Sequence, residues 1–123
     1  ALAQFDRRVA VLGVSQYAIP VRCRVNGPAV ECVVPTWSDV GALLEACNDV
    51  TLVAAAQKES ALLWVFARGH AYTVAGAAFD GFALPEKAAV ETGDLYQVLR
   101  VEPSRIELVD ERRGWGCRET LDL

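Results

Sequence analysis

Apolar and polar residues alternate over two neighbouring stretches of the chain, residues 17–25 and 29–35. Between them stands Asn26-Gly27-Pro28, which is typical of a turn, because Asn and Gly tolerate a positive φ and Pro cannot continue a strand ladder. Alternation with a period of two places successive side chains on opposite faces of a strand. The pattern therefore predicts a β-hairpin with one apolar and one polar face.

The register of this hairpin follows from its own pattern. Pairing Val25 with Val30 gathers the apolar side chains on one face, which is expected to point into the core. That face holds Val21, Cys23, Val25, Val30, Cys32 and Val34. The opposite face carries Arg22 and Arg24, with Glu31 directly across from Arg24. We expect this second face to be solvated, so that the Arg24–Glu31 pair contributes only about 0.2–1 kcal/mol.

A helical period follows the hairpin. The apolar residues at the spacing of one helical stripe are Val40, Leu43, Leu44 and Cys47. This spacing predicts a short helix of about ten residues, which must pack its stripe on a sheet. Ser38 is expected to cap the N-terminus of the helix, and Asp39 suits the positive end of the helix dipole. A buried strand is expected to follow at residues 50–56.

The remaining strands are expected at residues 9–15, 61–74, 95–101 and 105–109. Gly69 interrupts the second of these and predicts a bulge or a close backbone approach. Glu102-Pro103-Ser104 is expected to form a turn, and residues 75–93 a long loop of the kind that is functional or packs on a partner. About seven strands joined mainly by hairpins predict a mainly β, antiparallel barrel of about six to seven strands with one short helix.

Composition narrows the class of protein. The 123 residues fit one domain spanning 1–123, and 53% hydrophobic residues suggest strands buried on both faces or a surface hidden in an oligomer. The net charge of −4 argues against nucleic-acid binding. No apolar run approaches the roughly 20 residues that span a bilayer. We therefore expect a cytoplasmic protein that binds neither nucleic acid nor membrane.

The four cysteines and the single histidine lack the spacing of a zinc site. Cys23 and Cys32 face each other across the predicted hairpin, either as reduced core thiols or as a disulfide. Reduced thiols are favoured in a chain that otherwise looks cytosolic.

Several segments together resemble a known family. Residues 11–15 (VLGVS) run into residues 17–21 (YAIPV) like a first hairpin with its proline, and residues 33–38 (VVPTWS), the helix and residues 50–53 (VTLV) form a strand–helix–strand unit. Residues 68–71 (RGHA) lie within a long strand. These segments resemble the split β-barrel of the pyridoxamine 5′-phosphate oxidase-like, FMN-binding family. The tail at 113–121 (RGWGCRETL) is similar to that of small bacterial members.

The resemblance implies a homodimer with two FMN molecules at its interface, a small-molecule substrate and a flavin-dependent oxidoreductase activity. Many members place Arg or Lys after the serine at the helix start, where they hold the FMN phosphate. This chain carries Asp39, Val40 and Gly41 there. A non-catalytic dimer without flavin, binding another ligand or protein, is therefore an alternative. Binding of deazaflavin (F420) or haem in place of FMN is a further alternative on the same fold. His70 is the single histidine available to ligate haem.

The candidate cofactor contacts are Arg22, Thr36, Trp37, Ser38, Lys58, Trp115 and Arg118. Arg22 would meet a phosphate or an anionic ring edge, Trp37 would stack on the ring, and Ser38 would contact the phosphate. Lys58 would supply the missing cation, and the two tail residues would reach across the dimer. These residues also have structural interpretations. Arg22 would then lie on a solvated sheet face, and Trp37 and Ser38 would form a hydrophobic staple and an N-cap. Lys58 would lie in a solvated turn, and the two tail residues would belong to a tail that docks on the protein. No nucleophile and base stand at a catalytic spacing around the histidine, in agreement with chemistry carried by the flavin.

Overall fold

The computed structural model describes residues 2–36, 38–79, 81–82, 96–114 and 116–123. Its strands are β1 (Arg8–Val14), β2 (Tyr17–Asn26), β3 (Ala29–Pro35), β4 (Asp49–Lys58), β5 (Ala61–Val74), β6 (Tyr96–Asp110) and β7 (Arg118–Asp122). The described helices are α1 (Val40–Ala46) and two 3-10 helices, η1 (Leu2–Phe5) and η3 (Glu111–Arg113). None of these helices is long and apolar enough to cross a membrane.

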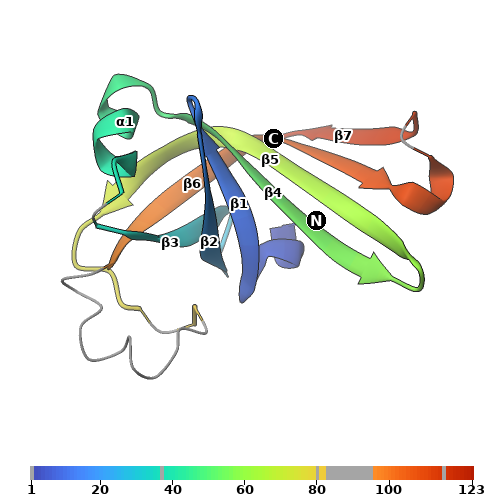
Figure 1. The fold of residues 1–123 in the computed structure, drawn as a ribbon, viewed down its shortest axis with the longest axis horizontal. Helices are drawn as coiled ribbons and strands as arrows, with labels where there is room; N and C mark the ends of the chain where they lie inside the picture. Colours follow the sequence, from blue (N-terminus) through green and yellow to red (C-terminus); the bar gives the residue numbers. More distant parts are fainter. Residues whose placement is uncertain (1, 37, 80, 83–95, 115) are drawn as a thin grey trace.

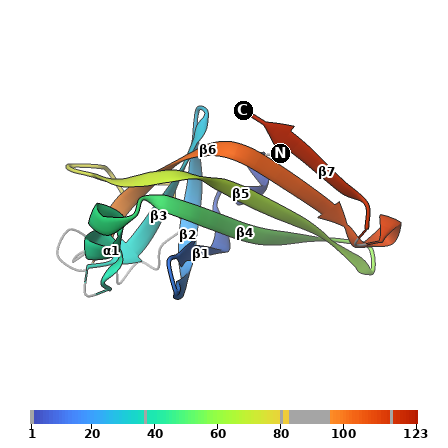
Figure 2. The same ribbon diagram turned by 90° about the horizontal axis from the view of Figure 1, so that it is seen from above.

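The strands close into a barrel. Neighbouring strands pair antiparallel in the order β3-β2-β1-β4-β5-β6, and pairing of β3 with the first half of β6 closes the ring. The second half of β6 extends past the barrel together with β4 and β5 and receives β7 on its free edge (Figure 1 and Figure 2). The predicted fold, a mainly β antiparallel split barrel with one short helix, is confirmed.

The predicted hairpin register is also confirmed. Val25 pairs with Val30 and Cys23 with Cys32, so the valine and cysteine face points into the barrel. Both thiols are fully buried, and their Sγ atoms lie 3.6 Å apart. Phe5 of η1 is buried in the same core cluster.

The prediction of a turn at residues 102–104 is wrong. β6 runs through these residues as one strand, and Pro103 lies opposite Gly69, where the register between β5 and β6 shifts. The bulge predicted at Gly69 is thereby confirmed. Proline is tolerated here because an irregular step in the ladder does not need its missing N–H. The described residues nevertheless form seven strands, the number predicted, because the tail contributes β7, which the pattern did not predict.

The prediction that the second face of the hairpin is solvated is also wrong. Glu31 is only 1% exposed and bonds two arginines, Arg24 from β2 and Arg100 from β6. Phe82 returns from the loop after β5 to cover this face, where it is buried against Val33, and the Arg24 guanidinium lies 4.2 Å from the centre of its ring. Of the long loop predicted at 75–93, residues 80 and 83–93 lie outside the described part.

The helix is shorter than predicted, and its cap differs. α1 begins at Val40 after Asp39, whose side chain makes no capping hydrogen bond. Ser38 does not cap the helix, because its Oγ donates to the carbonyl of Pro35 at 2.6 Å. Of the predicted apolar stripe, Val40 and Leu44 are buried, whereas Cys47 lies beyond the helix end and is exposed.

Candidate functional site

A hollow of about 340 Å³ lies on the outside of the barrel beside Arg22. We call it the Arg22 hollow. Its lining residues are Val9, Pro20, Val21, Arg22, Val33, Pro35 and Tyr96. Its walls are largely apolar, with a guanidinium and a phenol as the polar groups. A flat apolar ring with an anionic edge or tail is the ligand chemistry that such walls favour.

Strand pairing assembles this hollow. Arg22 lies opposite Val9 of β1 on one side and Val33 of β3 on the other. Pro35 ends β3 opposite Tyr96, the first residue of β6, and leads directly into Thr36. The structure therefore brings Arg22 to the strand–helix corner.

The corner residues differ in what they offer to a ligand. Thr36 is exposed, and Trp37 lies outside the described residues. Ser38 is half-buried, and its hydroxyl proton is engaged by the Pro35 carbonyl. To donate to a phosphate, Ser38 must first release this bond.

The candidates Lys58 and Arg118 lie on strands that do not line the Arg22 hollow. Lys58 ends β4 at the hairpin with β5, at the opposite end of the molecule from α1 (Figure 1 and Figure 2); its side chain is outside the described part. Arg118 lies on β7 and donates to the Glu107 carboxylate at 3.4 Å. Trp115 is also outside the described residues.

An apolar band continues from the hollow across the outer face of the sheet. Val9 and Val11 of β1 are 58% and 45% exposed. Val11 pairs with Val53 of β4, which pairs with Phe66 of β5, and the last two are half-buried. Exposed apolar side chains in one contiguous band are typical of an interaction surface.

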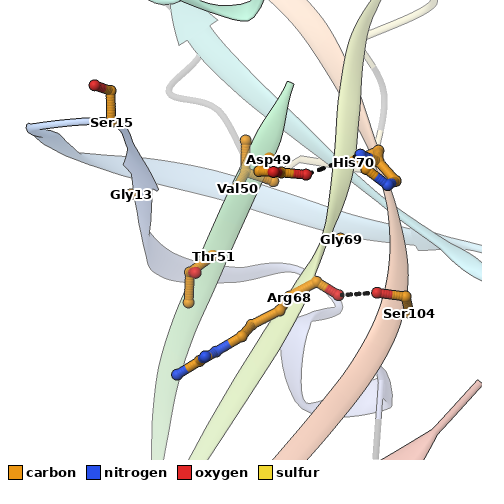
Figure 3. A pocket seen from close by; sticks show the side chains of 9 residues that line it. All are labelled: Gly13, Ser15, Asp49, Val50, Thr51, Arg68, Gly69, His70 and Ser104. Carbon is orange, nitrogen blue, oxygen red and sulfur yellow. Dashed lines mark hydrogen bonds and ion pairs between the residues drawn. The ribbon is translucent and has the colours of Figure 1, made fainter. Parts of the chain in front are cut away.

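A second hollow, of about 450 Å³, lies over the bulge at Gly69, and we call it the bulge hollow (Figure 3). Its lining residues are Gly13, Ser15, Asp49, Val50, Thr51, Arg68, Gly69, His70 and Ser104. His70 Nδ1 lies 3.1 Å from Asp49 Oδ1 and 3.2 Å from Asn48 Oδ1. Ser104 Oγ donates to the Arg68 carbonyl at 3.3 Å.

Sequence reasoning missed the bulge hollow as a site, although it singled out Gly69. Asp49, Thr51 and Ser104 come from two strands that pair with β5, so only the strand register places them beside the bulge. No group of three or more His, Cys, Asp or Glu side chains that would hold a metal occurs among the residues described by the structure.

Comparison with known proteins identifies the architecture. No protein-family model matches the chain, and no curated protein matches it in sequence. A solved structure of a Clostridium acetobutylicum protein related to general stress protein 26 of Bacillus subtilis, of the pyridoxine-phosphate oxidase family, superposes with a TM-score of 0.69 at 10% identity. The match covers 94% of this chain and 85% of that one. The chain has the pyridoxamine 5′-phosphate oxidase-like split-barrel fold.

Two further split barrels are similar in structure. A heme-binding protein from Mycobacterium smegmatis superposes with a TM-score of 0.67 at 17% identity, over 99% of this chain and 58% of that one. An FAD-binding protein from the same organism superposes with a TM-score of 0.55 at 16% identity, over 94% and 87% of the two chains. At these identities the likeness establishes the fold and leaves the ligand to be argued from this chain's own residues.

Proposed function

We propose that this split barrel is a homodimeric, FMN-dependent oxidoreductase acting on a small molecule, with the flavin bound in the Arg22 hollow. Bound FMN would supply the hydride and electron chemistry. The observation that carries the proposal is the meeting of Arg22, an apolar wall and the β3–α1 corner in one hollow. Structural similarity adds support, since one similar structure is that of an FAD-binding protein.

The chemistry of the walls fits a flavin. Pro20 and Val9 offer apolar surface to an isoalloxazine, and Tyr96 offers an aromatic ring with a hydroxyl. The planar guanidinium of Arg22 suits bidentate contact with a phosphate or with the electron-rich edge of the ring. Thr36 is exposed and lies next along the chain from the hollow.

A second copy of the chain supports the same proposal. The hollow, at about 340 Å³, is at the lower end of the size of ligand pockets, so one copy encloses only part of a mononucleotide. The exposed apolar band of Val9 and Val11 adjoins the hollow and would be covered by a partner. The partner's β4–β5 hairpin and tail would then supply Lys58, Trp115 and Arg118.

Titration with FMN tests this function. We expect the protein to retain flavin absorbance through gel filtration and to sediment as a dimer. Arg22→Gln should weaken FMN binding by about tenfold or more, since a lost charge-assisted hydrogen bond is replaced by a weaker neutral one. Arg112→Gln is the matched control, because Arg112 is held by Asp110 at 2.8 Å, away from the hollow. A wild-type protein that binds no FMN at any concentration would disprove the proposal.

A second candidate, the split barrel without flavin, is favoured by one observation. The exposed Asp39 stands at the start of α1, where many members of the FMN-binding family that the sequence resembles carry Arg or Lys. Val40 is 2% exposed and cannot become a charged residue without disturbing the core, so Asp39 is the position at which a cation is best restored.

The variant Asp39→Lys distinguishes the two candidates. If the missing cation limits affinity, Asp39→Lys should bind FMN at least about tenfold more tightly than wild type, because attraction replaces repulsion of the phosphate. Glu45→Lys makes the same change of charge on the exposed part of the same helix and should change affinity little. Equal FMN affinity in the two variants would reject a phosphate position at the helix start.

Haem is less well supported than flavin for this chain. The single histidine, His70, lines the bulge hollow and interacts with Asn48 and Asp49 rather than facing Arg22. A haem ligated by His70 would therefore occupy the bulge hollow. Its absorbance spectrum would differ from that of a flavin in the same titration.

A further inference from the structure

We propose that the Arg68 end of the bulge hollow binds a small oxyanion, the carboxylate or phosphate group of a ligand. This site is separate from the Arg22 hollow, and the inference stands whether or not flavin binds there. Three features carry it: an excess of positive charge, open space above a glycine, and a threonine hydroxyl on the same face.

Positive charge is concentrated on the outer face where β5, β6 and β7 meet. Arg68 lies directly opposite Arg105 across the β5–β6 pair, an arrangement that is unfavourable without compensating anions. Asp122 compensates Arg105 at 2.8 Å. Glu107 is shared, since it lies 3.4 Å from Arg118 and 3.8 Å from Arg68. Three arginines therefore face two carboxylates, in a protein whose net charge is −4.

Arg68 is the arginine of this group that has capacity for a ligand. Its separation from Glu107 is the longest of the three ion pairs, and its side chain is 56% exposed. A guanidinium carries five N–H donors, which one distant carboxylate does not satisfy. A bound oxyanion would accept two of these donors side by side.

The space for the anion lies above Gly13. Gly13 of β1 pairs with Thr51 of β4, which pairs with Arg68 of β5, so the three residues form one row across the sheet. Gly13 contributes no side chain to the hollow, and an added Cβ would find only the Thr51 carbonyl nearby, at 3.6 Å. The Arg68 side chain extends past Thr51, whose hydroxyl can donate to the same ligand (Figure 3).

The opposite end of the hollow repels anions and so determines the position of the ligand. His70 faces the exposed carboxylate of Asp49 at 3.1 Å and lies opposite Glu102, which accepts a hydrogen bond from Tyr72. Figure 3 shows His70 and the Arg68 guanidinium on different sides of the hollow. An oxyanion is therefore expected at Arg68 and Thr51 rather than at His70.

Titration of the backbone amide NMR spectrum with inorganic phosphate, and separately with acetate, tests this site at constant ionic strength. We expect saturable shifts at Gly13, Thr51 and Gly69, with the tighter of the two anions indicating whether phosphate or carboxylate is preferred. Arg68→Gln should weaken binding by about tenfold or more. Gly13→Val should also weaken it, because the side chain takes up the space above Gly13 while Arg68 stays in place.

Arg112→Gln is the control for this test, because it removes an exposed arginine elsewhere and should leave the shifts unchanged. The proposal is overturned if neither anion gives saturable shifts in the wild type, or if Arg68→Gln and Arg112→Gln reduce them equally. Because Arg22 does not line this hollow, Arg22→Gln should bind the anion like wild type, which separates failure here from failure of the flavin proposal.

Discussion

Replacing Glu31 by alanine is expected to lower the free energy of unfolding by about 3 kcal/mol, which corresponds to a fall in Tm on the order of 10 °C. The carboxylate accepts a hydrogen bond from Arg24 Nε at 2.8 Å and two from Arg100, at 3.0 Å and 2.8 Å. Alanine leaves both guanidinium groups without this partner, and one of them, Arg24, lies against the Phe82 ring. Because the two arginine side chains keep 18% and 32% exposure, water compensates part of the loss, and the lower end of the range for buried pairs applies.

The same carboxylate gives a pH signature. Burial acts to raise the pKa of Glu31, but the hydrogen bonds from Arg100 and Arg24 outweigh it, and the pKa lies below that of an ordinary glutamate. A group with a lowered folded pKa stabilises the fold fully above its unfolded pKa, about 4.3. This contribution is lost as the pH falls through the lowered folded value. Glu31→Gln should therefore flatten the decline in stability on the acid side.

Chemical denaturation at neutral and acid pH measures both effects. Glu119→Ala is the control, because Glu119 is exposed and forms a surface pair with Arg113, so its loss should change stability by less than about 1 kcal/mol. If Glu31→Ala were as mild as Glu119→Ala, the cluster of Arg24, Glu31 and Arg100 would contribute little, and closure of β3 on β6 would depend on the backbone ladder and apolar packing.

Replacing Gly69 by alanine is expected to destabilise the protein by about 3 kcal/mol or more. A Cβ at this position would lie 2.1 Å from the carbonyl oxygen of Glu102 and 2.7 Å from the Cα of Pro103. These are backbone atoms of the paired strand, so they cannot rotate away as a side chain would. Relief requires that β5 and β6 separate at the bulge, where both strands also carry the barrel wall.

Gly13→Ala is the matched control for this prediction. Its Cβ would meet the Thr51 carbonyl at an ordinary contact distance of 3.6 Å, so the variant should unfold at a similar or slightly higher denaturant concentration. Thermal and urea unfolding of the two variants measure the difference. Similar stability of Gly69→Ala and Gly13→Ala would mean that the bulge can open at little cost.

The position of Arg22 on the outer face of the β2–β3 hairpin was predictable, because it depends on a local pattern. Arg22 and Pro35 belong to strands joined by a short turn, and the alternation of valines and cysteines sets their register. The bulge hollow was not predictable in the same way. Asp49, Thr51 and Ser104 acquire their positions from pairings of β5 with β4 and with β6, and the bulge itself shifts the β6 register.

Burial of polar groups was also beyond the local pattern. Glu31 stands at a position that alternation assigns to solvent, and it is buried because β6 supplies Arg100 and the segment after β5 supplies Phe82. Likewise, a proline within a polar stretch is typical of a turn, yet Pro103 lies within a continuous strand because it faces the bulge.

The sequence by itself determined the antiparallel barrel class, the β2–β3 register, the bulge at Gly69 and the place of Arg22 on the outer face of the hairpin. Each of these depends on side-chain alternation or on backbone freedom within a few residues. Tertiary structure alone decided that β6 is continuous, that Glu31 is buried between two arginines, and that Arg68 lines an open hollow. Those outcomes depend on pairings between strands far apart in the chain, whose registers no local pattern encodes.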